Sequence, residues 1–263
     1  MNNKYKYLVS IWKCYHLSED IEFEVKKLRI LTANNVLNTY PYLKGKLRGV
    51  YKVCVTGSSA SGKTTMIRCF DPEAHGREVP RYFYVDYELL KENPDLFPES
   101  NTATQTFDFT VVALLIGGDN KTDIIKFNEL TEEIITERKV KWVTIFYLFG
   151  TPGQWRFKDI RAFAERRSDG VIFIIDPIDP KFKDNFMAFR EQVIKNVERK
   201  VPIIYVVNKQ DLPNVLAAKD LKQELNMPKT EIYDMSALKC QNIAIPIIAL
   251  IKKMQEEELG KKK

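Results

Sequence analysis

The sequence lacks any apolar run long enough to cross a bilayer. Its most apolar stretch, residues 243–251, has nine residues and contains Pro246, whereas a spanning helix needs about 18. Secretion and lipidation signals are also missing, since position 2 is asparagine and the last three residues are lysines. We therefore expect a cytoplasmic protein and leave open whether it is peripheral at a membrane.

Cysteine is scarce as well. The four cysteines stand at positions 14, 54, 69 and 240, and none of them forms a C-x-x-C pair. This usage predicts neither a zinc site nor a disulfide framework, and it suits a reducing cytosol.

Most of the chain lacks an excess of either charge. The formal net charge is +6 over 263 residues, and residues 1–50 alone hold nine Lys and Arg against four Asp and Glu. Because the remaining chain is nearly neutral, we expect no nucleic-acid partner. With 44% hydrophobic and 29% charged residues, the composition is that of an ordinary globular protein and excludes collagen-like and disordered classes.

Short β-branched runs alternate with helical patterns along the chain. Strands are predicted at 50–55, 107–116, 142–149, 171–175, 201–207 and 231–233, and helices at 64–70, 128–137, 182–193, 215–225 and 244–258. Such alternation gives a mostly parallel sheet with helices on both faces. We therefore predict an α/β fold with a doubly wound, mostly parallel six-stranded sheet.

The first chemical motif follows the first predicted strand. Residues 57–64 read G-S-S-A-S-G-K-T, a complete G-x-x-x-x-G-K-[ST] pattern that leads into a helix. The N–H groups of such a loop bind phosphate oxygens, so we predict a P-loop NTPase. Lys63 would reach the β- and γ-phosphates, and the Thr64 hydroxyl would ligate Mg²⁺. The expected nucleotide-binding residues here are Gly57, Ser58, Ser59, Ala60, Ser61, Gly62, Lys63, Thr64 and Thr65.

A second motif selects the base. Asn208-Lys209-Gln210-Asp211 ends the fifth predicted strand, at the sheet edge where doubly wound folds bind ligands. The Asp211 carboxylate can accept two hydrogen bonds from guanine, which adenine cannot supply. We expect Asn208 to brace the loops and the Lys209 stem to lie over the base. A third segment, Ser236-Ala237-Leu238-Lys239, places the Ala237 N–H where it could meet the guanine carbonyl.

In their order and spacing, these three segments resemble those of the Ras-superfamily small GTPases, over about residues 49–258. The run 208–213 (N-K-Q-D-L-P) is similar to the Arf-like branch, and 149–157 (F-G-T-P-G-Q-W-R-F) to the bacterial MglA-like branch. The resemblance implies a switch that binds GTP or GDP with Mg²⁺, hydrolyses GTP, and has effector, exchange and activating proteins as partners. Two alternatives stay open: a protein that holds nucleotide structurally, and an ATP-dependent P-loop enzyme, against which Asp211 argues.

The resemblance also assigns roles in the segment after the third strand. The Gly153 N–H would contact the γ-phosphate, and Gln154 would orient the attacking water, unless it is an ordinary turn residue. Gly150 stands where the family has a magnesium-holding aspartate. Asp108 is a candidate replacement, with Thr110 on the same strand face by alternation, although both could instead be exposed.

The switch threonine is expected just before Asp108. Thr102, Thr104 and Thr106 all qualify, and the family spacing favours Thr104. The implied catalytic set is then Gln154, Lys63 and Thr104, and the implied metal set is Thr64, Thr104 and Asp108. Because Ser59 could crowd the site and no arginine lies just upstream of Thr104, we expect slow hydrolysis that a partner stimulates.

We divide the chain into a basic N-terminal extension (1–48), a GTPase domain (49–258) and a basic tail (259–263). The domain has a long first switch loop at 71–106 and a charged insertion at 117–141. The helical wheel gives the extension an apolar face with Leu8, Ile11, Trp12 and Tyr15. Residues 1–30 could therefore contact a membrane peripherally, or this face could pack on the core.

Overall fold

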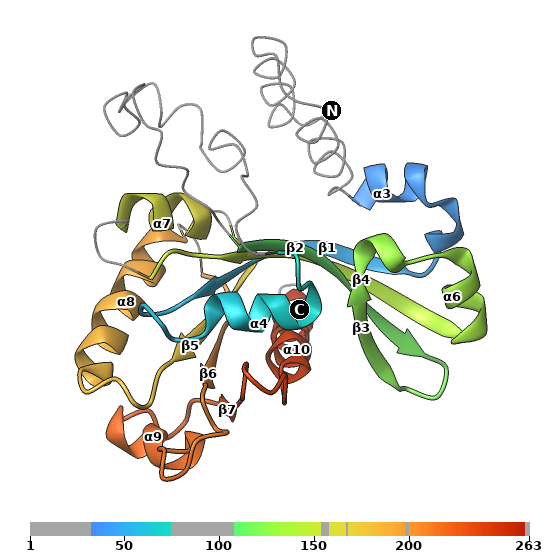
Figure 1. Ribbon diagram of the computed structural model, residues 1–263. Coiled ribbons are helices and arrows are strands. Elements are labelled where there is room, and N and C mark those ends of the chain that lie inside the picture. Colours follow the sequence, from blue (N-terminus) through green and yellow to red (C-terminus); the bar gives the residue numbers. More distant parts are fainter. Residues whose placement is uncertain (1–32, 75–107, 154–157, 167, 198–199, 261–263) are drawn as a thin grey trace, which may run out of the picture.

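The computed structural model describes residues 33–74, 108–153, 158–166, 168–197 and 200–260 (Figure 1). Its strands are β1 (Leu47–Thr56), β2 (Asp108–Gly117), β3 (Thr122–Lys126), β4 (Val140–Gly150), β5 (Gly170–Ile175), β6 (Ile203–Val207) and β7 (Ile232–Asp234). Its helices are α3 (Ala33–Thr39), η1 (Pro41–Leu43), α4 (Lys63–Phe70), η4 (Phe127–Glu129), α6 (Glu132–Glu137), α7 (Lys158–Glu165), α8 (Phe182–Asn196), α9 (Ala218–Glu224) and α10 (Ala244–Gly260). Among these described helices, none is long and apolar enough to cross a membrane.

The strands form one sheet in the order β3-β2-β4-β1-β5-β6-β7. Strand β2 is antiparallel to both of its neighbours, and all other pairs are parallel. The predicted α/β fold with a mostly parallel sheet is therefore confirmed. The sheet has seven strands rather than six, because residues 122–126 of the charged insertion pair with β2. This strand lies at the sheet edge, partly in solvent, so it lacks the continuous apolar run that marks a central strand.

Helices cover both faces of the sheet, as a doubly wound fold requires. Val53 and Val55 of β1 pack in a cluster with α4 and α10. Cys54, between them, points to the opposite face and packs in a cluster with α8 and α9. The predicted apolar stripe of α8 supplies Phe186 and Phe189 to that second cluster.

A third apolar cluster joins α3 and η1 to the insertion at 117–141. Val36 and Leu43 are fully buried there, against residues of η4, α6, β2 and β4, and the Tyr42 hydroxyl donates to the Leu130 carbonyl at 2.7 Å. Figure 1 shows α3 beside α6 at one end of the sheet. The last part of the N-terminal extension is thus packed against the insertion, which lies far away in the sequence.

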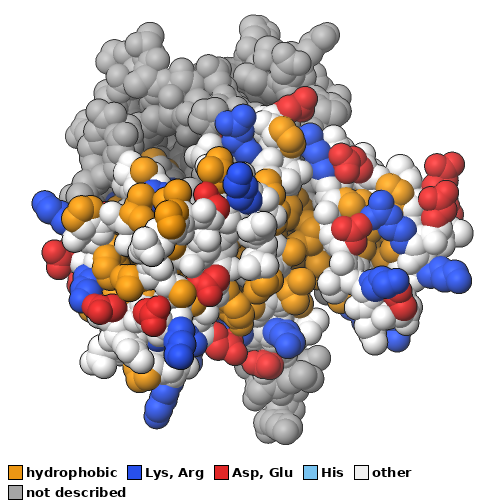
Figure 2. Space-filling model, turned by 60° about the horizontal axis from the view of Figure 1, so that its bottom comes forward, with side chains coloured by type: hydrophobic (Ala, Val, Ile, Leu, Met, Phe, Trp, Pro, Cys, Tyr) orange, Lys and Arg blue, Asp and Glu red, His pale blue; other side chains and the backbone are white. Residues whose placement is uncertain are grey.

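The apolar face at residues 8–15, the switch threonine candidates and Gln154 lie outside the described residues. Their proposed roles stay predictions. In the view of Figure 2, positively and negatively charged side chains are interspersed on the described surface.

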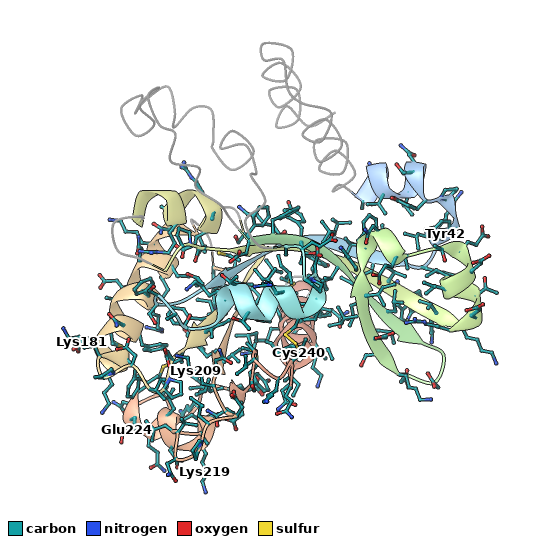
Figure 3. All side chains as sticks on the ribbon, in the orientation of Figure 1. Tyr42, Lys181, Lys209, Lys219, Glu224 and Cys240 are labelled. Atoms are coloured by element: carbon teal, nitrogen blue, oxygen red, sulfur yellow. A yellow bond between two sulfur atoms is a disulfide. The ribbon has the colours of Figure 1, made fainter. Side chains whose placement is uncertain are left out.

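The expectation of no disulfide was wrong. Cys69, near the end of α4, is bonded to Cys240, and their Cα atoms are 5.6 Å apart (Figure 3). The two residues are 171 positions apart in the sequence, so no local spacing pattern could indicate the pair. The bond joins the helix that follows the G-x-x-x-x-G-K-[ST] loop to the loop that begins at Ser236.

Candidate functional site

The loop at residues 57–62 connects β1 to α4 and surrounds the Lys63 side chain. The Lys63 ammonium donates to the carbonyls of Gly57 at 3.0 Å and Ser58 at 2.5 Å. Burial, and to a smaller extent the nearby Arg161 charge, lower the pKa of Lys63 to about 8. An anion beside this ammonium would offset the cost of its burial, which is what a phosphate-binding lysine needs.

Asn208 ties this loop to the loops that were expected to bind the base. Its amide nitrogen donates to the Ser61 carbonyl at 2.8 Å, and its amide oxygen accepts from the Ala237 N–H, also at 2.8 Å. Gly62 has a φ of 100°, and a Cβ there would collide with the Asn208 amide nitrogen, so only glycine fits. The sequence predicts that the Ala237 N–H meets the guanine carbonyl, but in this structure it donates to the Asn208 amide oxygen instead.

Asp211 lies beside Ser236 at the edge of the sheet. The Ser236 hydroxyl donates to the Asp211 carboxylate at 2.6 Å, and this bond lowers the pKa of that carboxyl below its ordinary value. The acid is therefore held in its ionised, acceptor-only form. Leu238 is 71% exposed, so its side chain takes no part in the packing of this loop.

Lys209 has a partner that sequence reasoning missed. Its ammonium forms an ion pair with Asp176 at 2.6 Å, and the Asp176 side chain is only 6% exposed. An acid directly after the wholly apolar strand β5 was the available signal. The pair fixes the lysine stem between β5 and β6, at the carboxyl ends of both strands.

The proposed metal-binding side chains Thr64 and Asp108 come together. The Thr64 hydroxyl donates to the Asp108 carboxylate. Asp108 pairs with Gly150 in the register of β2 and β4. Thr110 is buried and donates to Asp71 at 3.0 Å instead. The structure thus brings Asp108, and not Thr110, to the start of α4.

Gly153 rests on the phosphate-binding loop. A Cβ at this position would lie 2.6 Å from the Ser59 backbone nitrogen and 2.7 Å from the Lys63 ammonium, so no larger residue fits. Gln154 and Thr104, the other expected catalytic residues, lie outside the described part of the chain.

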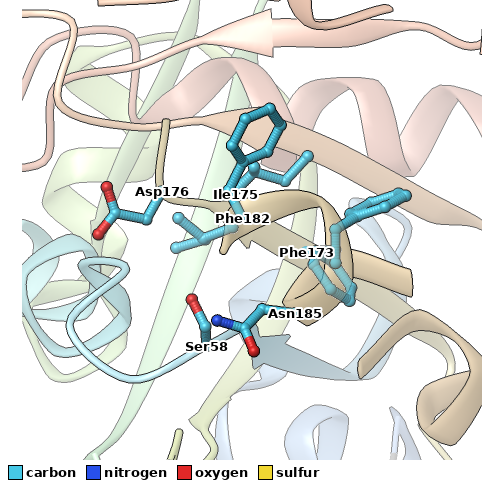
Figure 4. Close-up of a pocket in the computed structure, with 8 residues that line it drawn as sticks. Ser58, Phe173, Ile175, Asp176, Phe182 and Asn185 are labelled. Atoms are coloured by element: carbon cyan, nitrogen blue, oxygen red, sulfur yellow. The ribbon is translucent and has the colours of Figure 1, made fainter. Parts of the chain in front are cut away.

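A small pocket adjoins the loop at Ser58. It is formed by the end of β5, with Asp176, and by the start of α8, with Phe182 and Asn185 (Figure 4). Its lining is mostly apolar, with Ser58, Asp176 and Asn185 as the polar members. The pocket therefore adjoins the phosphate-binding loop at Ser58 and the Lys209–Asp176 pair at Asp176.

Comparison with known proteins gives one family and several relatives. The Ras family model matches residues 97–256, more than half of the chain. Human ADP-ribosylation factor-like protein 4A is 26% identical over 138 residues, covering 47% of this chain and 68% of that protein. The mutual gliding-motility protein MglA of Myxococcus xanthus is 28% identical over 88 residues, covering 32% of this chain and 45% of that protein. ADP-ribosylation factor-like protein 6 of Caenorhabditis elegans is 30% identical over 86 residues, covering 31% of this chain and 45% of that protein.

Proposed function

This chain belongs to the Ras family, as a GTP-binding switch of the Arf-like branch, and we propose that it hydrolyses GTP slowly alone and faster with an activating partner. Its three nucleotide-binding segments are those expected of the family. Lys63 and the N–H groups of residues 58–65 bind the phosphates, and Asp211 selects guanine.

The observation that carries this proposal is the position of Asn208. Its two hydrogen bonds join the Ser61 carbonyl of the phosphate-binding loop to the Ala237 N–H of the third segment. Asn208 is 3% exposed, so these bonds are sheltered from water. A single side chain therefore fixes the spacing between a phosphate site and a base site, which a chance Gly/Ser turn would not need.

The donor set at Thr64 and Asp108 fits Mg²⁺. Both offer hard oxygen atoms, the ligand type that Mg²⁺ prefers, and their contact brings a hydroxyl and a carboxylate to the phosphate-binding loop. Among the described residues, no group of three His, Cys, Asp or Glu could hold a metal. In this proposal, phosphate oxygens and Thr104 would supply further ligands, as in the family. When bound, Mg²⁺ would neutralise charge on the β- and γ-phosphates.

Hydrolysis in this proposal depends mainly on positioning. Gln154 would orient the attacking water while Lys63 and the Gly153 N–H stabilise charge on the phosphate oxygens. The Gly153 contact with Ser59 leaves little space there, which supports a slow intrinsic rate. Exchange, activating and effector proteins remain proposals, as do a cytoplasmic location and a peripheral membrane contact through residues 1–30.

Single-turnover hydrolysis of labelled GTP tests the proposal against its rival, a protein that holds nucleotide structurally. We expect GTP to bind in preference to ATP, and phosphate to be released slowly. Asp211→Asn should abolish the preference for guanine, whereas Asp220→Asn on the exposed side of α9 should not. Tight GTP binding without phosphate release, even with activating proteins of Arf-like relatives, would favour the rival.

A further inference from the structure

Arg161 on α7 is a buried charge that the proposed chemistry does not yet use. Its side chain is fully buried, although a guanidinium is costly to remove from water. It donates to the Pro152 carbonyl at 2.8 Å and to the Gln192 amide oxygen at 2.7 Å, and it lies over the Phe189 ring, 4.4 Å from its centroid. Because apolar packing alone would not call for a charge here, its polar contacts are the feature to explain.

The contact with Pro152 matters because of the peptide to which that carbonyl belongs. The Pro152 carbonyl and the Gly153 N–H are parts of one planar peptide unit, and no peptide bond among the described residues is cis. In a planar trans peptide the C=O and N–H bonds point in opposite directions. A guanidinium that holds the carbonyl toward α7 therefore turns the Gly153 N–H away from α7.

A second buried side chain of α7, Glu165, is linked to Thr151, the residue before Pro152. Glu165, one turn after Arg161, accepts from the Thr56 hydroxyl at 2.9 Å, and the Thr151 hydroxyl donates to Thr56 at 3.0 Å. The other Glu165 oxygen accepts from Asn196 at 2.7 Å. Two α7 residues four positions apart are thus bonded to two α8 residues four positions apart. In addition, Arg161 bonds directly to Pro152, and Glu165 is linked to Thr151 through Thr56.

From this arrangement we propose that Arg161 is a positioning residue for the γ-phosphate: it sets the direction of the Gly153 N–H and so determines how strongly GTP is preferred over GDP. The inference rests on the proposed function, since the N–H has a role only if a γ-phosphate binds beside it. The positive charge of Arg161 also polarises this peptide, which makes its N–H a stronger donor. Arg161 is hydrogen-bonded to Pro152 and Gln192, whereas the guanine-binding groups lie on other loops; among the phosphate-binding groups, its charge also acts on Lys63.

The test compares Arg161→Met with a matched arginine on the neighbouring helix. Arg190 of α8 donates to the Tyr205 hydroxyl at 3.0 Å, so Arg190→Met also removes a partly buried guanidinium. Affinities for GDP and for the slowly hydrolysed analogue GTPγS are measured with Mg²⁺. We expect the ratio of GTPγS affinity to GDP affinity to be about tenfold lower in Arg161→Met than in wild type. This is the effect of losing one hydrogen bond to a charged group.

The GDP affinity of Arg161→Met should stay within about twofold of wild type, and Arg190→Met should keep the wild-type ratio. Equal weakening of both nucleotides by Arg161→Met, or an unchanged ratio, would overturn the proposal. Gln192→Leu keeps Arg161 but removes one of its acceptors, and it should give a smaller loss in the same direction. It serves in place of Arg161→Met if that variant does not fold.

Hydrogen exchange of the nucleotide-free protein separates this inference from the proposed function. The exchange rate of the Gly153 amide should change in Arg161→Met and in Gln192→Leu but not in Arg190→Met, because only the first two variants release the Pro152–Gly153 peptide. Equal exchange would overturn the inference even if the protein binds GTP. If wild type binds neither nucleotide, the proposed function is wrong, and the role of Arg161 in nucleotide preference is wrong with it.

Discussion

Asp108 on β2 lies directly opposite Gly150 on β4 and occupies the space that a side chain at position 150 would need. A Cβ on Gly150 would lie 3.0 Å from the Asp108 Cβ and 3.3 Å from one of its carboxylate oxygens. The Asp108 carboxylate, in turn, accepts from the Thr64 hydroxyl. By the resemblance, the family has an aspartate at the position of Gly150 on β4. In this chain the acid at that level of the sheet is Asp108, on the neighbouring strand β2.

This relationship predicts the effect of Asp108→Asn. Loss of the carboxylate should weaken Mg²⁺-dependent GTPγS binding by about tenfold, since one charged oxygen is removed from the proposed metal site. Binding measured in excess chelator should change little. Asp184→Asn, on the exposed first turn of α8, is the control. A loss of affinity that is the same with and without Mg²⁺ would remove Asp108 from the metal site.

The same pair predicts that Gly150 cannot be enlarged. Gly150→Ala would force its Cβ against Asp108 and against Ile67, whose Cδ1 atom would be 2.8 Å away. We expect a loss of about 1–3 kcal/mol in the free energy of unfolding, as for other overpacked positions. Urea unfolding monitored by circular dichroism measures it. Gly118→Ala offers a control, because a Cβ there would approach only one atom, at 3.9 Å.

Glu165 predicts how stability changes with pH. Burial raises the pKa of its carboxyl from 4.5 to about 7, against the lowering effects of its bonds to Asn196 and Thr56 and of the charges on Arg161 and Lys52. The folded state holds this proton more tightly than the unfolded state does. The protonated Glu165 therefore makes its full contribution to the free energy of unfolding below about pH 4.5. It is lost as the pH rises toward about 7 and amounts to about 3 kcal/mol.

Unfolding free energies at pH 5 and pH 8 test this sign. Wild type should lose more stability over the interval than Glu165→Gln, because the amide carries no charge at either pH. The Asn196 amide can turn to accept from the new amide, so this variant should fold. Parallel losses in the two proteins would show that Glu165 does not carry its proton in the folded state.

The Cys69–Cys240 bond predicts a reductant-sensitive stability. Its removal should lower the free energy of unfolding by about 2–4 kcal/mol, because the bond closes a long loop in the unfolded chain. The double variant Cys69→Ala with Cys240→Ala should be less stable than oxidised wild type and insensitive to reductant. Thiol labelling in denaturant checks the bond itself: wild type should take up two more labels after reduction. An equal number before and after reduction would contradict it.

The ion pair between Lys209 and Asp176 predicts an effect on nucleotide release. Asp176→Asn leaves the lysine without its buried counter-charge, so the stem should no longer be held beside the base site. We expect nucleotide to dissociate several-fold faster, with little change in the preference for GTP over GDP, because Lys209 is expected to lie over the base, which the two nucleotides share. Release of a fluorescent GDP analogue measures the rate. An unchanged rate would show that the pair has no part in holding the nucleotide.

The sequence by itself determined the parts of this protein that local order encodes. The structure of the loop at 57–64 could be predicted because a strand, a glycine-rich turn and a helix follow one another directly in the sequence. Central strands such as β5 and β6 were evident because both of their faces are buried, which requires continuous apolar runs. The edge strand β3 escaped notice because a half-exposed edge needs no such run.

Only the tertiary structure decided which distant residues meet. The choice of Asp108 over Thr110 depended on the register between β2 and β4, which no spacing along one strand encodes. The Cys69–Cys240 bond, the Lys209–Asp176 pair and the Arg161 contact with Pro152 depended equally on how separate elements pack. Residues 33–46 belong to the predicted basic N-terminal extension (1–48), yet their apolar residues Val36 and Leu43 are buried against the insertion. Local patterns fix elements through backbone preference and periodicity, whereas partners are fixed by the sheet order and packing that bring those elements together.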